Sequence, residues 1–208
     1  MLSIGVAICL ALAGCADGAN RPATVHFASM NIQPATANRT VVCHGFGCAR
    51  RTVVTVSAPR IGELRRIFAA ADRSPQAERK AIEKAVMWFD RTYGPVVGTD
   101  KDVGGFDPEN AGKIGQQDCI DESTSTAGFL VLLEKNGMLK HYKVGKPVAR
   151  GFFLDGRYPH ATATIIDTSS GQKWAVDPWP YDAGKRPDVI PLDRWFQIMR
   201  GGARKDDA

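Results

Sequence analysis

The stretch "HATATIIDTSSGQKWAVD", residues 160–177, indicates a β-hairpin and decides the fold class. Two runs rich in β-branched and apolar residues are joined by the polar turn "TSSG" at 168–171, which is typical of a hairpin connection. Pairing around this turn sets Asp177 opposite either His160 or Thr162. Because these two registers differ by two residues, both leave the side chains of His160 and Asp177 on the same face of the sheet.

The residues that precede the hairpin favour helices. A helical pattern covers 60–71, and a second covers 75–93, with Ser74 as its N-cap and proline at its first position. A third helix is expected over 120–134, where Asn136-Gly137 ends it. Other β-type stretches are expected at 39–42, 50–57 and 140–153, and the chain closes with the apolar segment 191–199. Helices followed by antiparallel strands predict the α+β class.

The composition fits one globular domain. The chain has 208 residues, of which 44% are hydrophobic, enough for a single substantial core. Its 27 Lys and Arg exceed its 22 Asp and Glu, for a net charge of +5. The basic residues are scattered in pairs such as Arg50-Arg51 and Arg65-Arg66, a pattern typical of a solvated surface. We therefore expect no nucleic-acid partner.

The N-terminus indicates export. Residues 1–15 form an apolar stretch too short to span a bilayer as a mature helix. Leu12-Ala13-Gly14-Cys15 resembles the lipobox of bacterial lipoproteins, which implies a signal peptide, lipidation of Cys15 and a periplasmic protein with a membrane anchor. Residues 16–38 are rich in Ala, Thr, Asn and Pro without sustained periodicity, so a flexible tether is expected there. This leaves 39–208 as a single domain.

The remaining cysteines divide into a pair and a single thiol. In an oxidising periplasm, "CHGFGC" can close a short disulfide loop between Cys43 and Cys48, with two glycines to allow the turn. The alternative is a metal site that uses these two cysteines and His44, although it lacks an obvious fourth ligand. Cys119 is then the unpaired thiol.

Cys119 stands at the start of the third expected helix. The free N–H groups and positive dipole end of a helix favour a thiolate, lowering its pKa from about 8.5. Asp118 and Asp121 are expected to cap the first turn. The charge of Glu122 would instead raise the pKa of the thiol, and the sequence leaves that conflict open. His160 is the one histidine at the start of a convincing strand, and it can act as the base that such a thiol needs.

The loop before this helix carries three aspartates, Asp100, Asp102 and Asp107. Their carboxylates could bind calcium. However, no bidentate acid falls at the twelfth position of an EF-hand pattern. Aspartates that cap turns are therefore favoured over a calcium site.

The order of these residues resembles the transglutaminase-like superfamily of papain-like fold, including its bacterial cysteine-peptidase branches. The resemblance covers roughly 93–181 and depends on "DCIDESTSTAGF" and "PHATATIIDTSSGQKWAVDPW". It implies a nucleophile helix packed on an antiparallel β-sheet, with Cys119 as nucleophile, His160 as general base and acid, and Asp177 as the orienting carboxylate. The backbone N–H of Cys119, with a side-chain donor from Gln116 or Gln117, would form an oxyanion hole.

The function expected from this resemblance is that of a lipid-anchored thiol enzyme without a cofactor. It would cleave or transfer acyl groups at protein or peptide amides in the cell envelope. Hydrolysis is the first expectation, because water is abundant in the periplasm, and transamidation that cross-links proteins is the alternative within the same class. Two rivals stay open: a binding or structural lipoprotein of the same fold without turnover, and a redox or metal module built on "CHGFGC".

Overall fold

The computed structural model describes residues 18–106, 108–151 and 159–198. The expected signal peptide, Cys15 and Asp107 lie outside these residues, so the prediction of lipidation stays a prediction. No helix in the described ranges is both long enough and apolar enough to cross a membrane.

The described residues form an α+β structure, which confirms the class predicted from the sequence. The helices are α2 (Ala23–Ser29), α3 (Ala58–Ile67), α4 (Pro75–Val97), α5 (Cys119–Lys135) and α6 (Leu192–Gln197), with short 3₁₀ turns η1 (Gly18–Asn20), η2 (Ala71–Arg73) and η3 (Pro108–Asn110). The strands are β1 (Arg39–His44), β2 (Arg50–Thr55), β3 (Tyr142–Arg150), β4 (His160–Asp167), β5 (Lys173–Asp177) and β6 (Asp188–Pro191).

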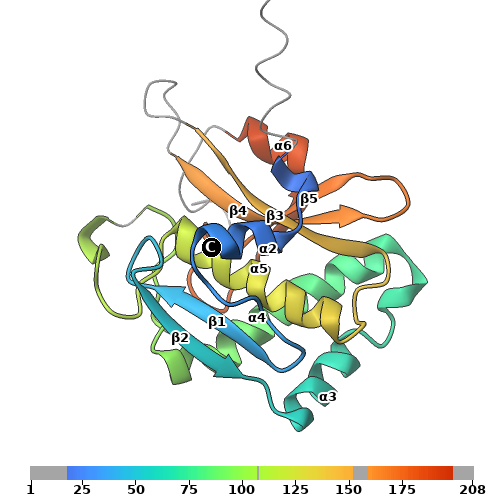
Figure 1. Cartoon of the computed structure of the whole chain (residues 1–208), viewed down its shortest axis with the longest axis horizontal. Helices are drawn as coiled ribbons and strands as arrows, with labels where there is room; N and C mark the ends of the chain where they lie inside the picture. Colours follow the sequence, from blue (N-terminus) through green and yellow to red (C-terminus); the bar gives the residue numbers. More distant parts are fainter. Residues whose placement is uncertain (1–17, 107, 152–158, 199–208) are drawn as a thin grey trace, which may run out of the picture.

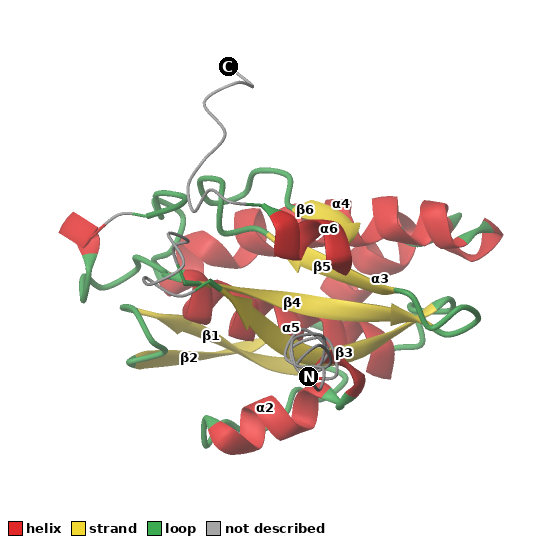
Figure 2. Cartoon of the chain, turned by 90° about the horizontal axis from the view of Figure 1, so that it is seen from above, coloured by secondary structure: helices red, strands yellow, loops and turns green. Residues whose placement is uncertain are grey.

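Helix α5 runs between two sheets (Figure 1). The β1–β2 hairpin covers one side of it, and the antiparallel sheet β3-β4-β5-β6 covers the other (Figure 2). Its second half is apolar and buried all round, as expected for a helix in the middle of a core. Small residues admit β1 at close range: a Cβ on Gly128 would lie 2.6 Å from Thr40 Oγ1, and Ser125 Oγ accepts the N–H of Cys43 at 2.9 Å.

The β4–β5 hairpin has the predicted turn. Asp167 Oδ1 accepts the N–H groups of Ser169 and Ser170, both at 2.9 Å, which closes the connection. Ala163 pairs with Val176, and continuing this register sets Asp177 opposite Thr162, the second of the two predicted alternatives. The hairpin therefore brings Asp177 to the same face as His160.

Two helix boundaries differ from the expectation. Helix α3 ends at Ile67, four residues early, and α4 continues past Tyr93 to Val97 with Pro95 in its last turn. Gly98, at φ +91°, ends α4 in a left-handed cap. The predicted N-cap of α4 is confirmed, because Ser74 Oγ accepts the N–H of Ala77 at 3.1 Å.

The tether expected over 16–38 is replaced, from Gly18 onward, by packed structure. Helix α2 buries Ala23 and Phe27, each 2% exposed, in the main core. His26 Nε2 lies 2.9 Å from Thr124 Oγ1 on α5. Ala23 and Phe27 are four residues apart and share one helix face. Two apolar residues one turn apart are too short a pattern to indicate a helix in a segment rich in Ala, Thr and Pro. The prediction of a flexible tether was therefore wrong from Gly18 onward.

Candidate active site

The start of α5 is closed by a reciprocal cap. Asp118 Oδ1 accepts the N–H groups of Ile120 at 3.0 Å and Asp121 at 2.8 Å, while Asp121 Oδ2 accepts the N–H of Asp118 at 3.2 Å. This arrangement is a capping box and confirms the caps predicted from the sequence. Cys119 is thereby held as the first residue of the helix.

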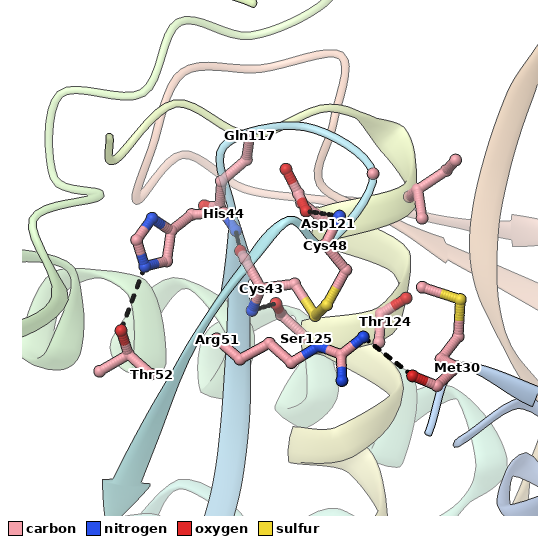
Figure 3. Close-up of a disulfide and its surroundings, with 12 residues drawn as sticks. Met30, Cys43, His44, Cys48, Arg51, Thr52, Gln117, Asp121, Thr124 and Ser125 are labelled. Carbon is pink, nitrogen blue, oxygen red and sulfur yellow. Dashed lines mark hydrogen bonds between the residues drawn. A yellow bond between two sulfur atoms is a disulfide. The ribbon is translucent and has the colours of Figure 1, made fainter. Parts of the chain in front are cut away.

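The predicted disulfide between Cys43 and Cys48 is present, and its loop is bound to the same helix start. Asp121, fully buried, accepts the N–H of Phe46 at 2.7 Å and of Cys48 at 2.6 Å (Figure 3). Asp118 Oδ2 accepts the N–H of Gly47 at 2.9 Å. These bonds are possible because all four residues from 45 to 48 have positive φ, which turns successive amides toward one side.

The alternative metal site on "CHGFGC" does not form. Both sulfur atoms are bonded to each other, and His44 points away from them in Figure 3. Its Nε2 lies 3.1 Å from Thr52 Oγ1, and its Nδ1 accepts the N–H of Gly115 at 3.3 Å. A metal would need the two cysteines as thiolates, which the disulfide excludes.

The structure brings together the three residues expected to carry the chemistry. His160 Nε2 lies 2.6 Å from Asp177 Oδ2, and each residue is 2% exposed. The thiol of Cys119 contacts the backbone beside this histidine: Sγ lies 4.0 Å from the carbonyl oxygen of Pro159, and the backbone of Ala161 is close enough to influence the pKa of the thiol. The order of thiol, imidazole and carboxylate is the one that nucleophilic catalysis requires.

The two ring nitrogens of His160 have different roles. Nε2 faces a carboxylate oxygen, so it carries the proton and donates it. Nδ1 is buried and has no hydrogen-bond partner. A buried nitrogen with a free lone pair can accept a proton, and the thiol of Cys119 contacts the backbone next to this histidine.

Two indole rings pack on this imidazole. The ring centroid of Trp179 lies 4.3 Å from that of His160, and the centroid of Trp195 lies 5.4 Å away. Trp195 Nε1 also donates to Asp177 Oδ2 at 2.7 Å. From the sequence, Trp195 belongs only to an apolar terminal segment. It lies 18 positions after Asp177, and no local pattern connects the two residues.

The environment raises the pKa of the Cys119 thiol to about 12 rather than lowering it. Burial is the main cause, and the negative charges of Asp118 and Asp177 add to it. The helix N-terminus was expected to favour the thiolate, but the carboxylate of Asp118 already occupies the N–H groups of Ile120 and Asp121. The thiol is therefore protonated at neutral pH and needs a base.

The environment of Glu122 disfavours the negative charge expected beside the thiol. Glu122 is 8% exposed, and its Oε2 has no hydrogen-bond partner. Burial, followed by the charge of Asp102, raises its pKa well above the usual range, which favours the protonated carboxyl. It lines a small cavity of about 20 Å³ together with Gln117 and Asp90, which is room for about one water molecule.

The two glutamines expected near an oxyanion hole have other partners. Gln117 Nε2 donates to the carbonyl of Cys43 at 2.7 Å, and Gln116 Nε2 donates to that of Lys101 at 3.0 Å. Gln116 Oε1 also accepts the N–H of Val103 at 3.3 Å. Both side chains therefore hold loops in place. Of the donors expected in an oxyanion hole, the backbone N–H of Cys119 remains.

The calcium alternative receives no support from the two aspartates that are described. Asp100 is exposed, whereas Asp102 is buried and accepts the N–H of Gln117 at 2.6 Å. Within the described ranges, the one group of three close potential ligands is Cys43, Cys48 and Asp121, and the disulfide uses two of them. Asp102 instead fixes the loop that leads into α5, through a bond to a residue 15 positions further on rather than within a local turn.

No family model, curated protein or solved structure matches the chain. The chemistry of the site therefore follows from its own geometry. A half-buried thiol contacts the backbone beside a histidine whose Nε2 is hydrogen-bonded to a buried carboxylate. Such an arrangement can attack a carbonyl carbon through sulfur, with the imidazole moving the proton.

Proposed function

We propose that the protein is a thiol enzyme that cleaves or transfers acyl groups at protein or peptide amides, with a papain-like fold of the transglutaminase-like type. The observation that carries this proposal is the state of His160. Its Nε2 lies 2.6 Å from Asp177 Oδ2, and its Nδ1 has no hydrogen-bond partner. Cys119 Sγ lies 4.0 Å from the carbonyl oxygen of Pro159, the residue before this histidine. This orientation leaves one nitrogen for proton transfer and uses the other for alignment.

The reaction begins when a substrate amide reaches the sulfur. His160 Nδ1 takes the thiol proton as Sγ attacks the carbonyl carbon, and the backbone N–H of Cys119 donates to the oxygen that becomes negative. The imidazolium then gives its proton to the leaving nitrogen, the C–N bond breaks, and a thioester to Cys119 forms. A water molecule attacks this thioester in the same way and releases the carboxylic acid and the thiol.

Asp177 stabilises the imidazolium that forms in both steps. The carboxylate and imidazole are 2% exposed, so the attraction between them is weakly screened. The ring of Trp179, which is 3% exposed, covers one side of the imidazole and keeps water from the pair. The positive charge on His160 appears only during the reaction. Asp177 therefore stabilises the transition state more than the resting state, and this difference accelerates the reaction.

The raised pKa of the thiol defines how attack occurs. A thiol with a pKa of about 12 is protonated at rest, so proton transfer to His160 accompanies attack and does not precede it. The same burial also favours the second candidate, a binding or structural protein of this fold without turnover, since an inert cysteine is commonly buried. The two candidates differ in whether an acyl donor reacts at Cys119.

p-Nitrophenyl acetate is a suitable donor because it needs no specific recognition. The wild-type protein should release nitrophenolate in a burst and gain one acetyl group, located at Cys119 by mass spectrometry of its peptides. Cys119→Ala should give no burst, and His160→Ala should slow it strongly. Trp88→Phe, which changes an indole that donates to Glu63 and to no residue of the site, is the matched control and should react like wild type. Absence of acetylation at Cys119 in the wild type would favour the binding protein.

The fate of the acyl group decides between hydrolysis and transamidation. Acetylated protein is isolated and mixed with a primary amine such as glycine methyl ester. We expect the acetyl group to appear mainly as acetate. N-acetylglycine methyl ester as the main product would identify a transamidating enzyme instead.

A further inference from the structure

Helix α6 reaches back over the sheet and delivers one side chain to the buried carboxylate. Strand β6 pairs with β5, where Asp188 lies opposite Asp177, and α6 follows directly at Leu192. Trp195 is 1% exposed and packs with Leu192, Val148 and other apolar residues in a small cluster on this side of the sheet. The indole is therefore held by packing as well as by its hydrogen bond.

Two donors meet on one oxygen of Asp177. His160 Nε2 lies 2.6 Å from Oδ2, and Trp195 Nε1 lies 2.7 Å from the same atom. Oδ1 is buried and has no hydrogen-bond partner. The oxygens of a buried carboxylate are normally both hydrogen-bonded. Two bonds to one oxygen therefore favour a particular orientation of the Asp177 carboxylate.

The second donor restricts how the carboxylate can turn. With His160 as its sole partner, Asp177 could rotate its terminal torsion, which is broad and roughly two-fold, and offer either oxygen. A bond from Trp195 at a fixed position restricts this torsion to settings that keep one carboxylate oxygen within reach of both Nε1 and Nε2. That orientation keeps the proton of His160 on Nε2 and the lone pair on Nδ1, because the bond at one nitrogen selects the tautomer.

Trp195 is itself held by β3. The guanidinium carbon of Arg150 lies 4.4 Å from the indole ring centroid, and Arg150 also donates to the carbonyl of Ile198 just after α6. Arg150 is the cross-strand partner of His160 in the sheet. The strand that neighbours the histidine therefore also positions the indole.

We propose that Trp195 is a positioning residue that fixes the orientation of Asp177 and thereby the tautomer of His160, with Nδ1 free to accept the thiol proton. The inference deepens the proposed function, on which its catalytic meaning rests. Its structural content concerns His160, Asp177 and Trp195 alone, so it can be tested even if Cys119 proves unreactive.

The test is the tautomer of His160 in Trp195→Phe, measured from imidazole ¹⁵N shifts above pH 8 in the full chain labelled at histidine. The wild type should show a protonated Nε2 and an unprotonated Nδ1. In Trp195→Phe the proton should be shared between the two nitrogens. Its acetylation by p-nitrophenyl acetate should be about 10- to 150-fold slower, as expected for the loss of one hydrogen bond to a charged carboxylate.

Trp179→Phe is the matched control, because it removes an N–H from the other indole that packs on His160 and leaves the bond from Trp195 in place. Its tautomer should stay that of the wild type. L-3-benzothienylalanine at position 195, with sulfur in place of the indole N–H, repeats the test without a change of shape and serves if Trp195→Phe does not fold. An unchanged tautomer in both position-195 variants would overturn the proposal and reduce Trp195 to packing.

Discussion

The disulfide between Cys43 and Cys48 offers a stability prediction whose size follows from the loop it closes. The two cysteines are separated by 5 positions, so the bond removes little freedom from the unfolded chain. The chain-entropy relation for a loop of this size gives about 2 kcal/mol. The double variant Cys43→Ala/Cys48→Ala should therefore lower the free energy of unfolding by about 2 kcal/mol, or the melting temperature by roughly 4–8 °C for a domain of this length.

The bonds from the loop to α5 limit the effect on chemistry. Asp121 accepts the N–H groups of Phe46 and Cys48 independently of the sulfur atoms, so the start of the helix keeps its partners when the bond is absent. We expect acetylation of Cys119 by p-nitrophenyl acetate to change by less than about threefold, within the effect of one neutral hydrogen bond.

Urea unfolding followed by tryptophan fluorescence measures the change in stability. Cys119→Ala, which keeps the disulfide, is the cysteine-matched control, and the same variant treated with dithiothreitol should reproduce the loss. Mass spectrometry after alkylation under denaturing, non-reducing conditions should count one free thiol among Cys43, Cys48 and Cys119. A loss below about 0.5 kcal/mol would refute the entropic reasoning and mean that the bonds to Asp121 order the loop without the sulfur link.

Three further predictions concern the site and the N-terminus. Asp177→Asn should keep the fold but slow acetylation by between about 10- and 10⁴-fold, because the charge that stabilises the imidazolium of His160 is lost; a rate equal to wild type at pH 7 in stopped-flow assays would exclude that role. Burial raises the pKa of Glu122 in the folded protein. The stability linked to its protonation is therefore fully present below the pKa of the unfolded chain and is lost as pH rises through the pKa of the folded protein. Between pH 5 and 8 the free energy of unfolding should thus fall less for Glu122→Gln than for wild type, whereas parallel urea curves would contradict the buried proton. Cys15→Ser should move the protein from the membrane to the soluble fraction of the producing bacterium, and its retention after a high-salt wash would exclude a lipid anchor at this residue.

Features set by short-range rules were predictable from the residues. The face shared by His160 and Asp177 follows from the two-residue period of a strand and holds for either register. The caps at Asp118 and Ser74 follow from the unpaired N–H groups at any helix start. The pairing of Cys43 with Cys48 needed only the chemistry of thiols and a short glycine-containing loop.

Features that depend on distant contacts needed the tertiary structure. The helix start was expected to lower the pKa of Cys119, yet burial against the hairpin backbone raises it, and burial is a property of the assembled core. Burial raises the pKa of Glu122 for the same reason. The bond from Trp195 to Asp177 joins a terminal helix to a strand end. The sequence by itself determined which side chains share a face or begin a helix, because those relations repeat with the backbone. Only the tertiary structure decided which of these side chains are buried and which partners they contact, because exclusion of water depends on elements far apart in the chain.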